Sequence, residues 1–166
     1  MELLFEIDKK DYDLNGKVFC RPSARGIILK DGKIAVIYSR KSKFYKIPGG
    51  GVEPGEDNLS AMIREVKEES GLTVLPETIK EFGYVHRIQK GEHEPVFVQD
   101  NFYYLCDVEN TQELPRYTDT EKSQEFIPVF VDLTEAIKVN QEYVKAHPWD
   151  VMIERELRVM KIISKW

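Results

Sequence analysis

The residues from Gly49 to Leu72 constrain this chain more than any other stretch, because a glycine-rich loop changes there into an acidic amphipathic helix. The loop half, Gly49–Gly55, holds four glycines and a proline, so we expect no regular structure in it. Asp57 or Asn58 can then cap a helix, and Gly71 stands where a left-handed C-terminal cap is expected. The stretch therefore predicts a loop followed by a helix that ends at Gly71.

The predicted helix carries an apolar stripe and, beside it, a row of carboxylates. The stripe consists of Leu59, Met62, Ile63 and Val66. The carboxylates are Glu65, Glu68 and Glu69, which share one edge because residues three and four apart are neighbours on a helix. Clustered like charges repel, and a hard cation such as Mg²⁺ would remove the conflict, since it takes oxygen ligands together with substrate phosphates. The pattern indicates a site for phosphate chemistry.

The spacing of the fixed residues in this stretch carries a resemblance to a known family. These residues are Gly50, Glu56, Arg64, Glu65, Glu68, Glu69 and Gly71, with aliphatic Val66 and Leu72. At every fixed position they resemble the Nudix box of the Nudix (MutT-like) hydrolases, G-x5-E-x7-R-E-U-x-E-E-x-G-U, where U is a bulky aliphatic residue. A chance match is on the order of 10⁻⁹ per starting position. The alternative, an ordinary solvated acidic helix after a turn, is disfavoured.

The resemblance implies a hydrolase that cleaves a diphosphate linkage in a nucleoside diphosphate joined to another group, using Mg²⁺ or Mn²⁺ and a water nucleophile. Divalent ions would neutralise phosphate charge and lower the pKa of a bound water. Arg64 would orient the glutamates through charge-assisted hydrogen bonds. By position, the implied metal ligands are Glu65, Glu68, Glu69, the backbone carbonyl of Gly49 and, as an occasional ligand, Glu56.

The general base stays open, because family members use either a glutamate of the box or one from a later loop. In the box the candidates are Glu68 and Glu65. In the later loop they are Glu121 and Glu125, for which a solvated loop acid is an equally good interpretation.

Three basic residues are candidates for contact with the substrate phosphates. Arg40 ends a strand-like run where relatives often place such an arginine, and Arg25 and Lys46 are weaker candidates. The window after the box, Arg87–Lys90, lacks the proline of ADP-ribose-cleaving relatives and the tyrosine of those acting on diadenosine polyphosphates. By elimination we expect a nucleoside triphosphate or a small nucleotide derivative. The aromatic candidates for stacking on its base are Phe44, Tyr45, Phe102 and Tyr103.

Composition supports one globular domain spanning residues 1–166, with 42% hydrophobic and 32% charged residues. The net charge of −5 argues against a nucleic-acid or membrane partner, so we expect a small partner, which the resemblance implies is a nucleotide-type substrate. The N-terminal residues do not match a signal peptide and no long apolar run occurs, so we expect a cytoplasmic location. The two cysteines, Cys20 and Cys106, lack metal or redox spacing, which predicts buried or half-buried reduced thiols. The histidines share no metal-ligand spacing.

The remaining pattern predicts an α+β fold, which the resemblance implies is an α/β/α sandwich. Strands are expected at residues 1–8, 23–29, 33–39, 44–47, 78–88, 95–108 and 126–131, a structureless connection at 109–123, and helices from about Thr134 and Asp150. Asp31-Gly32 predicts a hairpin that pairs 23–29 with 33–39. The order resembles the Nudix fold, a mixed sheet with helices on both faces, over residues 20–146.

Two short segments leave alternatives. Residues 11–16 reproduce the first half of a calcium-binding EF-hand loop, but Pro22 at its twelfth position makes a turn rich in Asp and Asn the better interpretation. The last helix is expected to dock on the sheet, with a homodimer surface as the alternative. For the whole chain, the alternative to an enzyme is a non-catalytic Nudix-like module that binds nucleotides or regulates.

Overall fold

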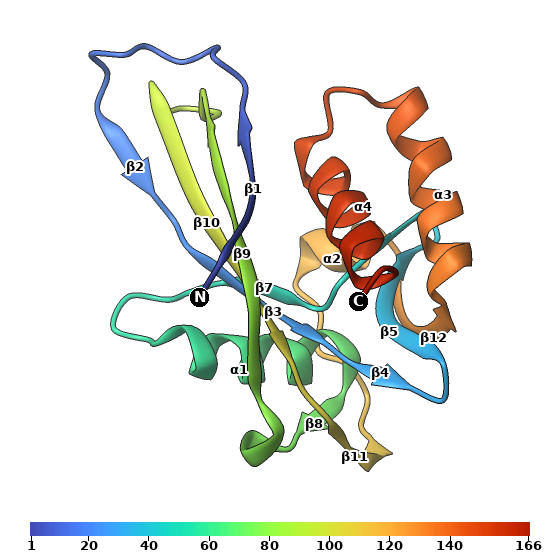
Figure 1. Cartoon of the computed structure of the whole chain (residues 1–166). Coiled ribbons are helices and arrows are strands. Elements are labelled where there is room, and N and C mark those ends of the chain that lie inside the picture. Colours follow the sequence, from blue (N-terminus) through green and yellow to red (C-terminus); the bar gives the residue numbers. More distant parts are fainter.

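A computed structural model describes residues 1–166, whose strands form three sheets (Figure 1). The strands are β1 (Leu3–Asp8), β2 (Val18–Cys20), β3 (Ser23–Ile27), β4 (Leu29–Lys30), β5 (Lys33–Ser39), β6 (Phe44–Lys46), β7 (Gly49–Gly51), β8 (Leu72–Val74), β9 (Lys80–Gln89), β10 (Val96–Leu105), β11 (Val108–Gln112) and β12 (Phe126–Asp132). The helices are α1 (Asn58–Ser70), α2 (Asp119–Ser123), α3 (Leu133–Ala146) and α4 (Val151–Ile163), with a 3₁₀ turn at Pro76–Thr78.

The largest sheet is mixed and has the order β1-β9-β10-β3-β7, with β2 also paired to β10. Its β9–β10 and β3–β7 pairs are antiparallel, whereas β1–β9, β2–β10 and β3–β10 are parallel. A second sheet has the order β12-β5-β4, with β6 on β5, and β8 pairs with β11. The predicted mixed sheet is therefore confirmed.

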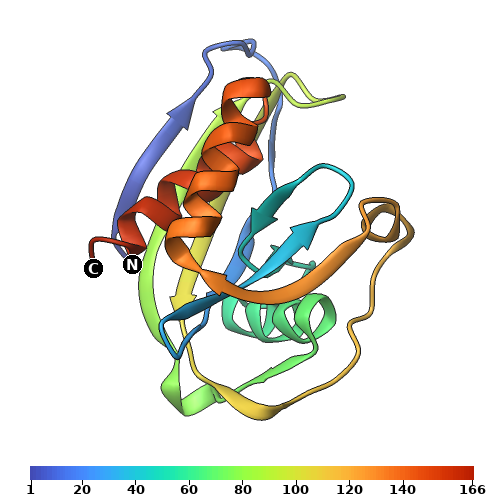
Figure 2. The ribbon, with the colours of Figure 1, turned by 90° about the vertical axis from the view of Figure 1, so that its right-hand side faces the viewer.

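Helices cover both faces of this β-structure, with α1 on one side and α3 and α4 on the other (Figures 1 and 2). Each side has its own core. A cluster of 10 buried residues lies under α1 and includes Met62 and Val66, and a cluster of 12 lies under α3 and α4 and includes Val159 and Met160. The α+β prediction and the docking of the last helix on the sheet are both confirmed.

Helix α1 begins and ends where its sequence predicts. The Asp57 carboxylate accepts the Ser60 backbone N–H at 2.9 Å, and Gly71 adopts φ 71°, with its N–H bonded to the Lys67 carbonyl. The predicted apolar stripe is wrong at Leu59, which is 43% exposed. Leu59 lies in the first turn of α1, where its side chain meets solvent.

The glycine run is a strand, and the prediction of no regular structure there is wrong for Gly49–Gly51. These residues form β7, antiparallel to β3. Glycine makes this pairing sterically accessible, because a Cβ atom on Gly49, at φ 146°, would lie 2.3 Å from the Ala24 carbonyl oxygen. The loop proper follows β7.

The predicted hairpin is correct only near its turn. Asp31 and Gly32 adopt φ 51° and 75°, the positive angles of a two-residue hairpin turn, and β4 pairs with β5. Ser23–Ile27 instead belongs to the other sheet, because the chain passes from one sheet to the next at Ile28. One apolar run thus serves two sheets.

Two further segments differ from the prediction, and one agrees with it. The connection at 109–123 is not structureless, since it contains β11 and α2, whose Thr118 and Glu121 form a reciprocal capping box. Helix α3 begins at Leu133, one residue before the predicted start at about Thr134, and Asp132 at its N-cap position makes no side-chain capping bond. The turn before β2 is confirmed as rich in Asp and Asn, with the Asp13 carboxylate accepting the Asn15 N–H at 3.0 Å.

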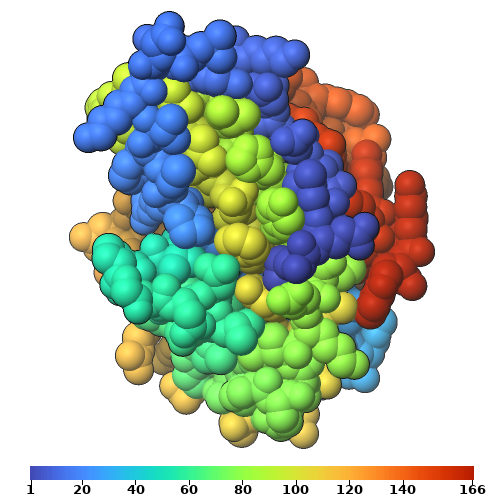
Figure 3. Space-filling model, turned by 60° about the vertical axis from the view of Figure 1, so that its left-hand side comes forward, coloured from blue at the N-terminus to red at the C-terminus, as the bar shows by residue number.

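The N-terminal strands flank the β9–β10 hairpin and lie above α1 on one face of the molecule (Figure 3). None of the helices is both long enough and apolar enough to cross a membrane. Both cysteines are free thiols: Cys106 is buried as expected, but Cys20 is exposed, which corrects its predicted burial. It lies on β2, a short strand whose side chains all face solvent.

Candidate active site

A cleft of about 380 Å³ runs between β7, α1 and the segment that leads into α2, and none of its lining residues is apolar. The lining residues are Arg21, Arg25, Lys46, Gly49, Gly50, Gly51, Glu53, Arg64, Glu65, Glu68, Glu69, Arg116, Thr118 and Glu121. The three carboxylates of the predicted ligand set come from consecutive turns of α1. The glycine strand brings its backbone close to them, because a Cβ atom on Gly50 would lie 2.5 Å from the Glu65 carboxylate.

Arg64 connects the acidic residues of the cleft. Its Nε and Nη2 each donate to Glu56 at 2.9 Å, and its Nη1 donates to Glu65 at 2.8 Å and to Glu68 at 3.3 Å. The hydrogen bonds from Arg64 hold the pKa of Glu56 below its ordinary value. Glu56 itself does not line the cleft. It acts as the anchor that fixes the guanidinium against Glu65 and Glu68.

Glu69 is the most deeply buried of the three carboxylates, at 2% exposure. One of its oxygens forms an ion pair with Lys46, and the other accepts the Gly49 N–H at 2.9 Å. Burial raises the pKa of Glu69, and the ammonium of Lys46 opposes this rise. Lys46 also lies 4.9 Å from the centre of the Phe126 ring.

The backbone that precedes the glycine strand is held by buried charges. Arg25 Nη1 donates to the carbonyls of Ile47 and Gly49, each at 3.0 Å. Glu156 on α4 accepts the Ile47 N–H at 2.8 Å and lies 3.5 Å from Arg25 Nε. The predicted phosphate ligand Arg25 and the predicted metal-ligand carbonyl of Gly49 are therefore bonded to each other.

The donor set fits a hard divalent cation, because it offers carboxylate oxygens and a backbone carbonyl on the wall of one cleft. In this structure no group of three His, Cys, Asp or Glu side chains lies close enough together to hold a metal ion. Arg64 and Lys46 neutralise the carboxylates instead. A divalent cation would compete with these two side chains.

Of the other predicted residues, one lines the cleft and two do not. Glu121 lines it, and although burial acts to raise its pKa, hydrogen bonds from the Thr118 N–H and hydroxyl hold that pKa below the ordinary value. Glu125 and Arg40 do not line the cleft. They meet in a neighbouring turn, where the Arg40 N–H donates to the Glu125 carbonyl at 3.3 Å.

A second pocket of about 330 Å³ shares Lys46 and Glu121 with the cleft and adds apolar surface. Its other lining residues are Ser42, Phe44, Thr120, Gln124, Phe126, Tyr143, Asp150 and Met152. Of the aromatic candidates for stacking on a base, only Phe44 lines this pocket.

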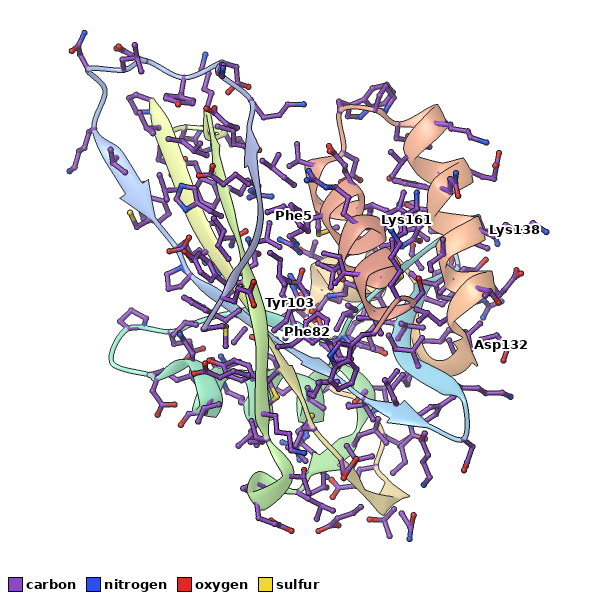
Figure 4. All side chains as sticks on the ribbon, in the orientation of Figure 1. Phe5, Phe82, Tyr103, Asp132, Lys138 and Lys161 are labelled. Carbon is purple, nitrogen blue, oxygen red and sulfur yellow. The ribbon has the colours of Figure 1, made fainter.

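The other three aromatic candidates are occupied elsewhere. Tyr103 lies fully buried between the sheet and α4, and its hydroxyl donates to Glu156 at 3.2 Å (Figure 4). Phe102 packs against Tyr84, and Tyr45 against Tyr38. Alternation along a strand explains the difference, because neighbouring residues face opposite sides of the sheet.

Several residues at or beside the cleft lie outside the box and were not predicted from the sequence. They are Arg21, Arg116, Thr118, Tyr117 and Glu156. The Tyr117 hydroxyl donates to the backbone carbonyl of Glu69 at 2.9 Å, and the Arg116 N–H donates to that of Glu68 at 2.6 Å. Both bonds fasten the α2 segment to the end of α1. Arg21, Arg116 and Thr118 line the cleft, whereas Tyr117 and Glu156 bond to the backbone beside it.

The histidines lie apart from the cleft, as expected. His86 pairs with Asp100 at 2.7 Å across β9 and β10, and His147 stacks on Tyr143. His93 is exposed in the β9–β10 turn.

Two curated proteins are similar in sequence. A Bacillus subtilis (strain 168) protein named putative 8-oxo-dGTP diphosphatase YtkD is 30% identical over 118 residues, which cover 70% of this chain and 67% of that protein. An ADP-ribose pyrophosphatase of Methanocaldococcus jannaschii is 48% identical over 50 residues, which cover 28% of this chain and only 30% of that protein.

Solved structures show the same fold. A NUDIX hydrolase from Nitrosomonas europaea superposes with a TM-score of 0.56 at 20% identity, covering 74% of this chain and 79% of that one. A MutT NUDIX hydrolase from Burkholderia pseudomallei gives 0.52 at 20% identity, covering 70% and 85%. A family model described as NUDIX domain matches residues 21–150. The chain therefore belongs to the NUDIX family.

Proposed function

We propose that this chain is a Mg²⁺- or Mn²⁺-dependent pyrophosphohydrolase that cleaves the diphosphate linkage of a nucleoside diphosphate derivative, with water attacking phosphorus. The observation that carries the proposal is that Glu65, Glu68, Glu69 and Arg64 of the complete box line one wholly polar cleft. Two curated relatives, named ADP-ribose pyrophosphatase and putative 8-oxo-dGTP diphosphatase, support a substrate of this class.

The proposed roles follow from how each carboxylate is held. Glu65, Glu68, Glu69 and the Gly49 carbonyl would hold the divalent cation, which would supply charge neutralisation and an activated water. Arg64 keeps Glu65 and Glu68 in place. We assign the general base to Glu68, since its only side-chain bond is a 3.3 Å contact and its side chain is 43% exposed.

The second pocket supports a nucleoside as the group attached to the phosphates. It adjoins the cleft at Lys46 and Glu121, and its aromatic lining suits a base while its polar lining suits a ribose. The cleft itself suits only the phosphates. A nucleoside triphosphate or a small nucleotide derivative meets both requirements.

The test is a substrate panel with identified products. Purified protein is incubated with Mg²⁺, with Mn²⁺ or with a chelator against nucleoside triphosphates, ADP-ribose, nucleotide sugars and dinucleoside polyphosphates, and the products are separated by chromatography. We expect metal-dependent cleavage of one class into a nucleoside monophosphate and the complementary phosphate-bearing product, and loss of this cleavage in Glu69→Gln.

A panel without cleavage would contradict the proposal. If a nucleotide then still raised the melting temperature, mass action would show binding without turnover, and the non-catalytic module would replace the enzyme. The neutralisation of Glu69 by Lys46 and the Gly49 N–H is the observation that favours this second candidate.

A further inference from the structure

The lining of the cleft holds equal numbers of positive and negative side chains. The carboxylates are Glu53, Glu65, Glu68, Glu69 and Glu121, and the cations are Arg21, Arg25, Lys46, Arg64 and Arg116. A divalent cation bound there would add two positive charges to this balanced set. The loaded cleft would then attract an anion, and the question is which side chains would receive it.

Three of the five cations are already bonded within the protein. Lys46 is paired with Glu69, and Arg64 with Glu56, Glu65 and Glu68. Arg25 is buried, and its guanidinium donates to two backbone carbonyls. Each of these groups would have to break a protein contact before it could hold a substrate phosphate.

The other two cations, Arg21 and Arg116, have no side-chain hydrogen bond and no ion pair in the structure, and both are exposed. The two arginines lie at different positions beside the row of carboxylates. The Arg21 guanidinium lies over the glycine strand, because a Cβ atom on Gly51 would be 3.0 Å from its Nε. Arg116 is fixed at the end of α1 by the 2.6 Å bond from its N–H to the Glu68 carbonyl.

Two free guanidinium groups beside a row of carboxylates suit a ligand that carries several anionic oxygens. The planar guanidinium binds phosphate through two parallel N–H donors, which gives both strength and orientation. The backbone bond from Arg116 to the Glu68 carbonyl fixes the base of that side chain. Both guanidinium groups are exposed, so a ligand would have to order them, and each can receive one phosphate.

We propose that Arg21 and Arg116 are the phosphate-binding residues of the cleft and together hold the diphosphate of the substrate against the carboxylates of α1. This inference rests on the proposed function and names the side chains that recognise its substrate class. It replaces Arg40, which lies outside the cleft.

The test is equilibrium binding of methylenediphosphonate, a diphosphate analogue that cannot be hydrolysed, measured by titration calorimetry in Mg²⁺. The variants are Arg21→Met and Arg116→Met, and the matched control is Lys138→Met, which removes one positive charge from the outer face of α3 (Figure 4). We expect each arginine variant to weaken binding by about tenfold or more and the control to stay within about twofold. Unchanged affinity in either arginine variant would overturn the proposal.

Turnover separates this inference from the proposed function. On the best substrate of the panel, each arginine variant should raise KM by about tenfold and change kcat much less, because the contacts are made in the ground state as well as in the transition state. Hydrolysis with unchanged KM and unchanged analogue affinity would refute phosphate binding by Arg21 and Arg116 but would support the proposed hydrolase activity. Analogue binding that depends on both arginines, without hydrolysis of any substrate, would support phosphate binding by these residues and refute the proposed hydrolase activity.

Discussion

Lys46 and Glu69 form an ion pair that is almost fully withdrawn from water, with side-chain exposures of 9% and 3%. Such a pair compensates for its lost hydration only while both partners are present. It therefore couples the fold to the chemistry, because the same carboxylate is proposed to hold the divalent cation. The Gly49 N–H also donates to this carboxylate.

Removing one partner of this pair should destabilise the fold. We predict that Lys46→Met lowers the free energy of unfolding by about 3–5 kcal/mol in the absence of metal, since Glu69 would be left as a buried charge. Urea denaturation measures the effect. The double variant Lys46→Met/Glu69→Gln should be more stable than Lys46→Met alone, and equal stability of the two would show that the pair is not coupled.

The two thiols should differ in reactivity. Cys106 is buried, and burial raises the pKa of its thiol to about 12, whereas Cys20 is exposed on β2. We predict that one thiol reacts with Ellman's reagent in the native protein near pH 8 and that the second reacts only after denaturation. Cys20→Ser should abolish the fast reaction. Two fast thiols in the native protein would contradict the burial of Cys106.

At the residue scale, the box could be predicted and its partners could not. Glu65, Glu68 and Glu69 are spaced along one helix, so local geometry alone places them together. The sequence predicts Lys46 as a phosphate ligand, but its contact with Glu69 joins β6 to α1 and depends on the tertiary fold. The pairing that neutralises a cation is a property of the fold and leaves no trace in local sequence.

Among the elements, α1 shows how far local signals reach. Its N-cap, C-cap and buried stripe follow from residue type and spacing, and only Leu59 departs from the pattern. The cap is chemically simple, because the Asp57 carboxylate accepts both the N–H and the hydroxyl of Ser60. Its contribution to stability can be isolated by substitution.

We predict that Asp57→Ala lowers the free energy of unfolding at pH 7, because the first turn of α1 loses its N-cap. The hydrogen bonds from Ser60 lower the pKa of Asp57 in the folded state, so its charge stabilises the fold fully above the ordinary value of 3.8. That contribution is lost as the pH falls through the lower, folded pKa. Denaturation of both proteins at pH 7 and pH 3 measures this, and a difference that grows toward low pH would contradict it.

Other elements could not be predicted, because tertiary pairing decided them. Gly49–Gly51 has the composition of a loop and becomes a strand only because β3 lies beside it. The run from Ser23 to Leu29 looks like one strand, yet two sheets divide it. The capping box that starts α2 is visible in Thr118 and Glu121, but the helix is only five residues long and gives no periodicity.

At the scale of the whole molecule, α4 connects the core under α3 and α4 to the cleft. Arg155 and Glu156 on this helix are fully buried beneath the sheet. The Glu156 carboxylate accepts bonds from Arg155, Tyr103 and the Ile47 N–H, so one side chain joins α4, β10 and the backbone that leads into the glycine strand. The family pattern covers the box, but the hydrogen bonds of Glu156 come from a helix near the C-terminus and were not predicted.

We predict that Glu156→Gln lowers the free energy of unfolding by about 3–5 kcal/mol, because Arg155 and Arg25 would lose their buried counter-charge. Glu154→Gln is the matched control on the same helix. It breaks only a 3.7 Å pair with the half-exposed Arg158 and should change stability by less than about 1 kcal/mol. Urea denaturation measures both effects. Equal effects of the two substitutions would show that Glu156 contributes no more to the free energy of unfolding than a surface charge does.

The central claim is that the carboxylates of α1 perform the hydrolysis, and turnover by Glu68→Gln tests it most directly. This side chain is 43% exposed, so the substitution should leave the melting temperature unchanged. Glu113→Gln, which removes an exposed acid paired with Lys67, is the control. On the best substrate with Mg²⁺, we predict that Glu68→Gln loses at least about 100-fold in kcat while the control stays within about twofold. Turnover by Glu68→Gln equal to that of the control would contradict the assignment of the active site.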